Sequence, residues 1–154
     1  MPRKSPFTAE EFVFFKALKK RRVPFLVVGL SAATLQGAPV VTQDVDLWFR
    51  DLASPAFLKA VKDAGGFYVP PFGMNAPLLG GKGLELLDIV TTVHGLKNFD
   101  EEYRKSYKIK LEGLELRILP LDRIIQSKKT LGRDKDRAVL PVLKDTLKTI
   151  KSKL

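Results

Sequence analysis

The sequence contains no cysteine, one histidine and one tryptophan among its 154 residues. The absence of cysteine excludes disulfide bonds and cysteine–zinc sites. No apolar run reaches the roughly eighteen residues that a membrane-spanning helix needs. No apolar segment of the signal-peptide type follows the basic N-terminal residues either. We therefore expect a cytoplasmic protein without a membrane segment.

Charge is uneven along the chain. The 27 Lys and Arg residues exceed the 17 acids, for a net charge of +10. Residues 1–22 carry seven basic residues against two acids and residues 121–154 carry ten against four, whereas residues 23–120 carry ten against eleven. Basic ends favour polyanionic partners such as a nucleoside triphosphate or RNA. A solvated surface that keeps the protein soluble is the alternative reading.

Length and composition indicate one globular domain over residues 1–154, since 45% of the residues are hydrophobic and 29% charged. Capping residues, apolar periodicity and Gly or Pro breaks predict both helices and strands. Residues 70–83, rich in Pro and Gly, are expected to form a loop or hairpin, and residues 95–106 remain unassigned. The predicted helices cover 8–22, 31–36, 54–64, 121–131 and 134–151, and the predicted strands cover 25–28, 44–49, 67–69, 84–92, 107–111 and 114–119.

Two aspartates on the predicted strand 44–49 are the first candidates for chemistry. Because side chains alternate along a strand, Asp44, Asp46 and Trp48 point to one face and the apolar residues between them point into the core. The two Cα atoms lie roughly 6–7 Å apart. Like charges at that range repel unless a cation lies between them, and Mg²⁺ binds carboxylate oxygens. The pair predicts half of a metal site, with the polar face of an edge strand as the alternative.

A third acid lies on the predicted strand 84–92. Alternation places Asp88 on one face with Leu86 and Val90. An acid in an apolar strand is uncommon without a partner or a metal. Asp88 is therefore the third candidate, with a solvent-facing residue at a strand end as the alternative.

These residues resemble the signature of a known family. Val28-Gly29-Leu30-Ser31, twelve further residues and then Asp44-Val45-Asp46-Leu47 are similar to the motif of the nucleotidyltransferase superfamily, which has the DNA-polymerase-beta-like fold. Asp88 matches the family's later acid. The segments 119–128 and 132–136 look like the ending of small prokaryotic members, a group that includes toxins of toxin–antitoxin pairs. The resemblance covers about residues 23–143.

The resemblance implies an α/β (α+β) fold with a small mixed sheet flanked by helices. It also implies a metal-dependent enzyme that transfers a nucleoside monophosphate from a nucleoside triphosphate, such as ATP, to a hydroxyl group and releases pyrophosphate. Asp44 and Asp46 would bind two Mg²⁺ ions, with Mn²⁺ as an alternative. Asp88 would bind the catalytic ion and draw the acceptor's proton. RNA such as a tRNA end, a protein hydroxyl and a small molecule are all open as acceptors, and an antitoxin chain is an expected partner.

The nucleotide-binding residues implied by the resemblance are Gly29, Leu30, Ser31, Lys128 and Arg133. The glycine turn would bring backbone N–H groups to the triphosphate, and the two cations would neutralise its β- and γ-phosphates. The alternative for Gly29 is a plain turn between a strand and a helix, and the alternative for Lys128 and Arg133 is a solvated helix face. Lys135 and Asp136 are expected to form a local ion pair.

One position departs from the family pattern. Members carry a second small residue directly after the first glycine, whereas this chain has Leu30 there and Ser31 one position later. If Ser31 cannot take that place, the protein is a decayed nucleotide- or RNA-binding module without turnover. A further alternative treats Asp44-Val45-Asp46 as the nucleophile motif of a phosphatase.

Overall fold

The computed structural model describes residues 6–153, so Arg3 and Lys4 of the basic N-terminal end lie outside the described residues. Residues 6–153 form six helices and seven strands. The helices are α1 (Ala9–Lys20), α2 (Gly29–Leu35), α3 (Pro55–Asp63), α4 (Phe99–Arg104), α5 (Leu121–Leu131) and α6 (Asp134–Ser152). The strands are β1 (Phe25–Val28), β2 (Val45–Phe49), β3 (Phe67–Val69), β4 (Leu78–Gly80), β5 (Leu87–Val90), β6 (Tyr107–Leu111) and β7 (Leu114–Ile118).

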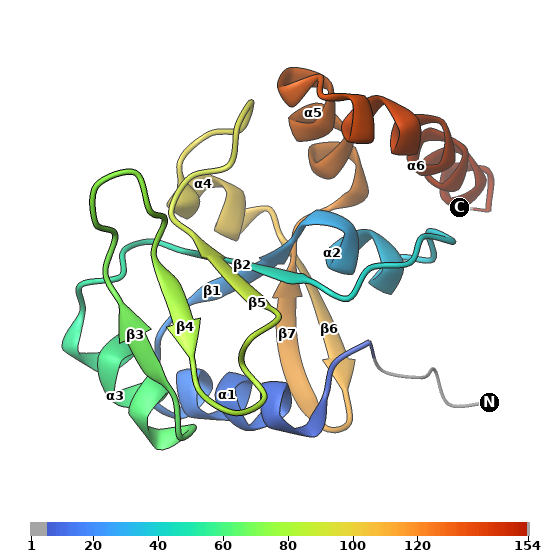
Figure 1. Cartoon of the computed structure of the whole chain (residues 1–154). Helices are drawn as coiled ribbons and strands as arrows, with labels where there is room; N and C mark the ends of the chain where they lie inside the picture. Colours follow the sequence, from blue (N-terminus) through green and yellow to red (C-terminus); the bar gives the residue numbers. More distant parts are fainter. Residues whose placement is uncertain (1–5, 154) are drawn as a thin grey trace.

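Five strands form a mixed sheet in the order β5-β2-β1-β7-β6 (Figure 1). β1 pairs with β2 in antiparallel fashion, whereas β2 pairs with β5 and β1 pairs with β7 in parallel. Helices flank this sheet, and α5 and α6 stand together at one end of the molecule (Figure 1). The predicted small mixed sheet with flanking helices is confirmed. None of the helices within residues 6–153 is long and apolar enough to cross a membrane.

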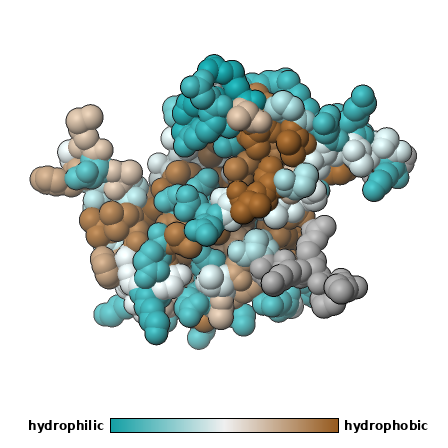
Figure 2. Space-filling view, turned by 45° about the vertical axis from the view of Figure 1, so that its right-hand side comes forward, coloured by the Kyte–Doolittle hydropathy of each residue, from teal (hydrophilic) through white to brown (hydrophobic). Residues whose placement is uncertain are grey.

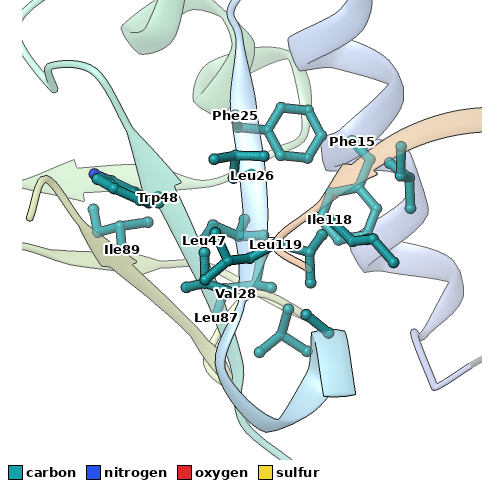
Figure 3. Packing of buried hydrophobic residues seen from close by; sticks show 14 of the residues in the cluster. Phe15, Phe25, Leu26, Val28, Leu47, Trp48, Leu87, Ile89, Ile118 and Leu119 are labelled. Atoms are coloured by element: carbon teal, nitrogen blue, oxygen red, sulfur yellow. The ribbon is translucent and has the colours of Figure 1, made fainter. Parts of the chain in front are cut away.

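The core follows from strands that are apolar on both faces. All four residues of β1 are buried, as expected of a central strand. On one side of the sheet, Phe15 of α1 stacks on Phe25, and Phe57 of α3 meets Phe49 edge to face. Figure 3 shows the Phe25 ring beside the Phe15 ring, with Leu47 further along the sheet. This packing fixes β1 and β2, the two strands that lead to the candidate site.

Trp48 lies on the same strand face as Asp46, as alternation predicted, but it is buried, with only 1% of its surface exposed. Phe99 of α4 packs edge to face on it at 5.7 Å between ring centroids. The indole therefore has no open ring face for a nucleobase. Its Nε1 donor has no hydrogen-bond partner among the described residues.

The structure defines two segments that the sequence left open. Residues 70–83 contain β4, which pairs antiparallel with β3, so the hairpin alternative holds there. Residues 95–106, which had no assignment, contain α4, capped by the Asn98 side chain. The buried Glu102 carboxylate binds Arg123 of α5 at 2.6 Å and ties α4 to α5. The weak signal of α4 reflects its short length, because tertiary contacts stabilise so short a helix more than propensity does.

Gln36 fixes α5 relative to α2. Its side-chain amide donates to the Leu119 carbonyl at 2.8 Å, and its side-chain oxygen accepts from the Leu121 N–H at 2.9 Å. Both groups lie where β7 turns into α5, around Pro120, which has no N–H to donate. One side chain thus satisfies the polar backbone at this turn and sets where α5 begins.

We expect Leu47→Ala to lower the free energy of unfolding by about 2–5 kcal/mol, because it removes a fully buried side chain from the central sheet. Leu58→Ala on α3 is the matched control, since Leu58 is 43% exposed and should cost less than about 1 kcal/mol. Urea unfolding of both variants measures the difference. Equal losses of unfolding free energy in the two variants would show that Leu47 of β2 is not an important part of the core.

Candidate active site

Asp46 and Asp88 lie directly beside each other on neighbouring strands. They are register partners in the parallel pair β2–β5, and Val28 is the partner of Asp46 on β1. Because register partners point to the same face, the two carboxylates share one side of the sheet. The structure therefore places Asp88 directly beside Asp46.

The two carboxyl groups perturb each other. Burial, and then the negative charge of Asp88, raise the pKa of Asp46 to about 6. Partial burial, and then the charge of Asp44, raise the pKa of Asp88. Lys128 opposes the shift at Asp46. This is the signature of crowded acids that lack a compensating cation between them.

Gly29 lies against Asp46. Its φ is +67°, in the left-handed region that favours glycine. A Cβ atom at this position would stand 2.5 Å from Oδ2 of Asp46, closer than real contacts allow. Glycine is required here both by the turn and by the approach of the carboxylate.

Leu30 and Ser31, the next two predicted residues, differ in their placement. Leu30 is half-buried and lines a cavity together with Asp44 and Asp46. Ser31 is buried, and its hydroxyl donates to the backbone carbonyl of Asp44 at 2.9 Å. That hydroxyl is engaged inside the protein, which argues against its direct contact with a phosphate. It ties α2 to the segment that carries the acids.

Lys128 and Arg133 are held together by one buried acid. Asp136 has no exposed side-chain surface, and it binds Arg133 Nε at 2.6 Å and Lys128 Nζ at 3.4 Å. The Arg133 guanidinium is the main cause that holds the pKa of Asp136 down at about 2. The predicted pair of Lys135 with Asp136 is therefore wrong. Adjacent residues of a helix point in different directions, whereas Arg133 lies three positions earlier on the same face.

Two cavities meet at the acids. They share Asp46, Asp88, Lys128 and Arg133. The first, which we call the apolar cavity, has a volume of about 390 Å³, and the second, the charged cavity, about 320 Å³. The apolar cavity is further lined by Val28, Gly29, Ala76, Pro77, Ile89, Val90, Thr92, Val93, His94, Leu119, Ile124, Ser127 and Leu131. The charged cavity is further lined by Leu30, Thr42, Asp44, Lys135, Asp136 and Val139.

Sequence reasoning missed the polar residues of the apolar cavity. Thr92 and His94 follow β5 in a loop, and Ser127 lies on α5 one residue before Lys128. His94 could have been identified from the sequence as a candidate site residue, because it is the only histidine and follows the strand of Asp88. Nothing in the sequence marks Ser127 as a site residue, since its position in the cavity depends on how α5 packs. The structure also adds Lys135 to the charged cavity.

Three carboxylates line one cavity, and their oxygen atoms are the kind of ligand that a hard divalent cation prefers. Asp44, Asp46 and Asp88 all line the charged cavity, and the raised pKa of Asp46 marks negative charge that such an ion would relieve. As their side chains stand, however, no three acidic or histidine residues within residues 6–153 form a metal-ligand group. The fit therefore rests on the donors and their shared cavity.

Solved structures with the same arrangement of elements are nucleotidyltransferases. The crystal structure of ANT(2'')-Ia in complex with adenylyl-2''-tobramycin superposes with a TM-score of 0.61 at 17% identity, over 92% of this chain and 89% of that one. The lincosamide antibiotic adenylyltransferase LnuA, with lincomycin bound, gives 0.60 at 12% identity, over 91% of this chain and 98% of that one. This chain has the nucleotidyltransferase fold.

A solution structure of the antibiotic-resistance factor ANT(2'')-Ia gives a TM-score of 0.62 at 15% identity, over 90% of this chain and 82% of that one. No protein-family model matches the sequence, and no curated protein matches it. The resemblance inferred from the motifs is thus confirmed at the level of the fold. Structural similarity at such low sequence identity shows the fold, but it does not identify the substrate.

We expect Gly29→Ala to displace the Asp46 carboxylate and to reduce nucleotide-dependent activity by more than about tenfold, besides losing about 1–3 kcal/mol to backbone strain. Gly37→Ala is the matched control, since Gly37 has φ +101° but no neighbour within 4 Å of the added Cβ. It should be similarly strained and retain activity. Thermal unfolding and turnover of both variants make the comparison, and equal activity losses would contradict the role of Gly29.

We expect Asp136→Asn to lower stability by about 1–2 kcal/mol at neutral pH, because Lys128 and Arg133 lose their common partner. The pKa of Asp136 is depressed to about 2 in the folded state, below its ordinary value of 3.8. Its contribution is therefore present above pH 4 and disappears as the pH falls towards 2. Urea unfolding of both proteins between pH 7 and about pH 2 should show the two stabilities converging. A constant difference would refute this account.

Proposed function

We propose that this protein is a nucleotidyltransferase that moves a nucleoside monophosphate from a nucleoside triphosphate to a hydroxyl acceptor and releases pyrophosphate. The observation that carries the proposal is the side-by-side placement of Asp46 and Asp88, between a charged cavity and an apolar one. The nucleotidyltransferase fold supports it, because neighbours of the same fold are adenylyltransferases by name or hold an adenylylated product.

The basic and acidic residues of the site would have different roles. Lys128, Arg133 and Lys135 line the charged cavity and would hold the triphosphate, with Asp136 keeping the first two in place. Gly29 leaves space for the Asp46 carboxylate beside the transferred phosphoryl group. Asp88 faces the apolar cavity as well, and there it would accept the proton of the acceptor hydroxyl.

Asp44, Asp46 and Asp88 are the residues that would bind Mg²⁺. When bound, the ion would supply charge neutralisation for the phosphoryl group and its leaving pyrophosphate. Binding should offset the repulsion from Asp88, which adds to burial in raising the pKa of Asp46. We propose Mg²⁺ first, because carboxylates together with substrate phosphates are the donors it usually takes.

A binding module without turnover is the second candidate, and Leu30 is the observation that favours it. Leu30 places an apolar side chain in the charged cavity, where the family pattern has a small residue. Calorimetry with a non-hydrolysable ATP analogue, beside a transfer assay, separates the two candidates. Binding without transfer, together with transfer gained by Leu30→Ser, would identify a decayed site.

We expect Asp46→Asn and Asp88→Asn to lower transfer by at least about a thousandfold, because each removes a charge beside the reacting phosphate and preserves side-chain shape. The assay follows labelled triphosphates into product with Mg²⁺ and mixed acceptors. Asp145→Asn is the control, since Asp145 is an exposed acid on α6. If the wild type transfers none of the four nucleotides, the proposed activity is excluded.

A further inference from the structure

The two cavities that meet at Asp46 and Asp88 differ in chemistry. The charged cavity is lined by the cations Lys128, Arg133 and Lys135, of which the first two also border the apolar cavity. The apolar cavity is closed mainly by aliphatic side chains of β5, α5 and the loop after β5, such as Ile89, Leu131 and Val93. Because they share the acids, a phosphorus atom held there faces both cavities.

Phosphoryl transfer requires the attacking and leaving oxygens to lie roughly in line on opposite sides of phosphorus. The pyrophosphate that leaves carries several negative charges, so the cationic cavity suits it. The attacking hydroxyl must then approach on the side of phosphorus away from the pyrophosphate. The apolar cavity is the other space that Asp46 and Asp88 line.

We propose that the apolar cavity receives the acceptor, and that the acceptor is a compact, largely apolar alcohol rather than an amine-rich compound or a nucleic acid. This inference rests on the proposed function. The cavity's volume of about 390 Å³ is that of a site for a small molecule. Apart from the groups shared with the charged cavity, the polar side chains at its wall are those of Thr92, His94 and Ser127, which would orient the alcohol.

The charges that line the apolar cavity argue against an amine-rich acceptor. Among the described residues that line the apolar cavity, the only acids are Asp46 and Asp88, which the reaction itself requires. Asp136 of the neighbouring cavity is already paired with Arg133 and Lys128. An acceptor with several ammonium groups would therefore enter without partners for its charges.

The rim of the cavity is apolar as well. Ala76 and Pro77 of the β3–β4 connection line it, and the same connection carries Phe72, 80% exposed, and Met74, fully exposed. Hydrophilic side chains instead gather at the end of the molecule that α5 and α6 form (Figure 2). A nucleic acid would be expected on that basic end rather than along the apolar rim.

The test is binding of cyclohexylmethanol to the protein loaded with Mg²⁺ and a non-hydrolysable ATP analogue, measured by saturation-transfer NMR. Leu131→Trp and Val93→Trp each fill the apolar cavity, the first from α5 and the second from the loop after β5. Leu58→Trp on α3 is the control, since it adds the same ring elsewhere. The 4-aminomethyl derivative of the same alcohol adds one ammonium group to an unchanged skeleton.

We expect the alcohol to bind the wild type and Leu58→Trp, and to bind the two cavity variants at least about tenfold more weakly, with the affinity for the nucleotide analogue unchanged. The aminomethyl derivative should bind about tenfold more weakly than the parent. The inference is overturned if the alcohol does not bind the wild type or if the ammonium group does not weaken binding.

Two further outcomes would also overturn it. Loss of nucleotide affinity in Leu131→Trp would show that the cavity holds the nucleoside, and nucleotide transfer to RNA that this variant leaves unaffected would show a different acceptor. Failure of the proposed function is seen separately, as absence of nucleotide binding or transfer in the wild type.

Discussion

Two like charges held side by side, Asp46 on β2 and Asp88 on β5, are the constraint on which the rest of the site depends. Two adjacent carboxylates without a cation between them destabilise each other, and burial together with the charge of Asp88 raises the pKa of Asp46 to about 6. The sheet tolerates it because β2 is anchored elsewhere, through Leu47 and Phe49 in the core. Core packing thus maintains an arrangement that electrostatics alone would open.

The surrounding contacts serve the same pair. Gly29 leaves space beside Asp46, and the Ser31 hydroxyl holds the chain at Asp44. Gln36 sets the start of α5, which brings Lys128 towards the acids, and Asp136 fixes Lys128 and Arg133 there. The result is a charged cavity and an apolar cavity that meet at the carboxylates, an arrangement that the proposed transfer would use.

Local patterns were enough to predict most of the fold. Capping residues located α1 and α3, Pro120 and Gly132 bounded α5, and the apolar run 25–28 identified a central strand. The motif of residues 28–31 and 44–47, with Asp88 as the later acid, resembles that of the nucleotidyltransferase superfamily, and the observed fold agrees with this resemblance. Cytoplasmic location, an antitoxin partner and an RNA acceptor stay predictions, because a fold does not determine them.

Tertiary structure alone decided which side chains meet. The sequence by itself determined that Asp46 and Asp88 lie on strands, since alternation is local, whereas Asp44, predicted on the same strand, directly precedes β2. The register that pairs Asp46 with Asp88 depends on contacts across the sheet. Burial of Trp48 required α4, a helix too short for a clear pattern. His94 likewise reached the apolar cavity only through packing of its loop, because the sequence specifies neighbours along the chain and folding specifies neighbours in space.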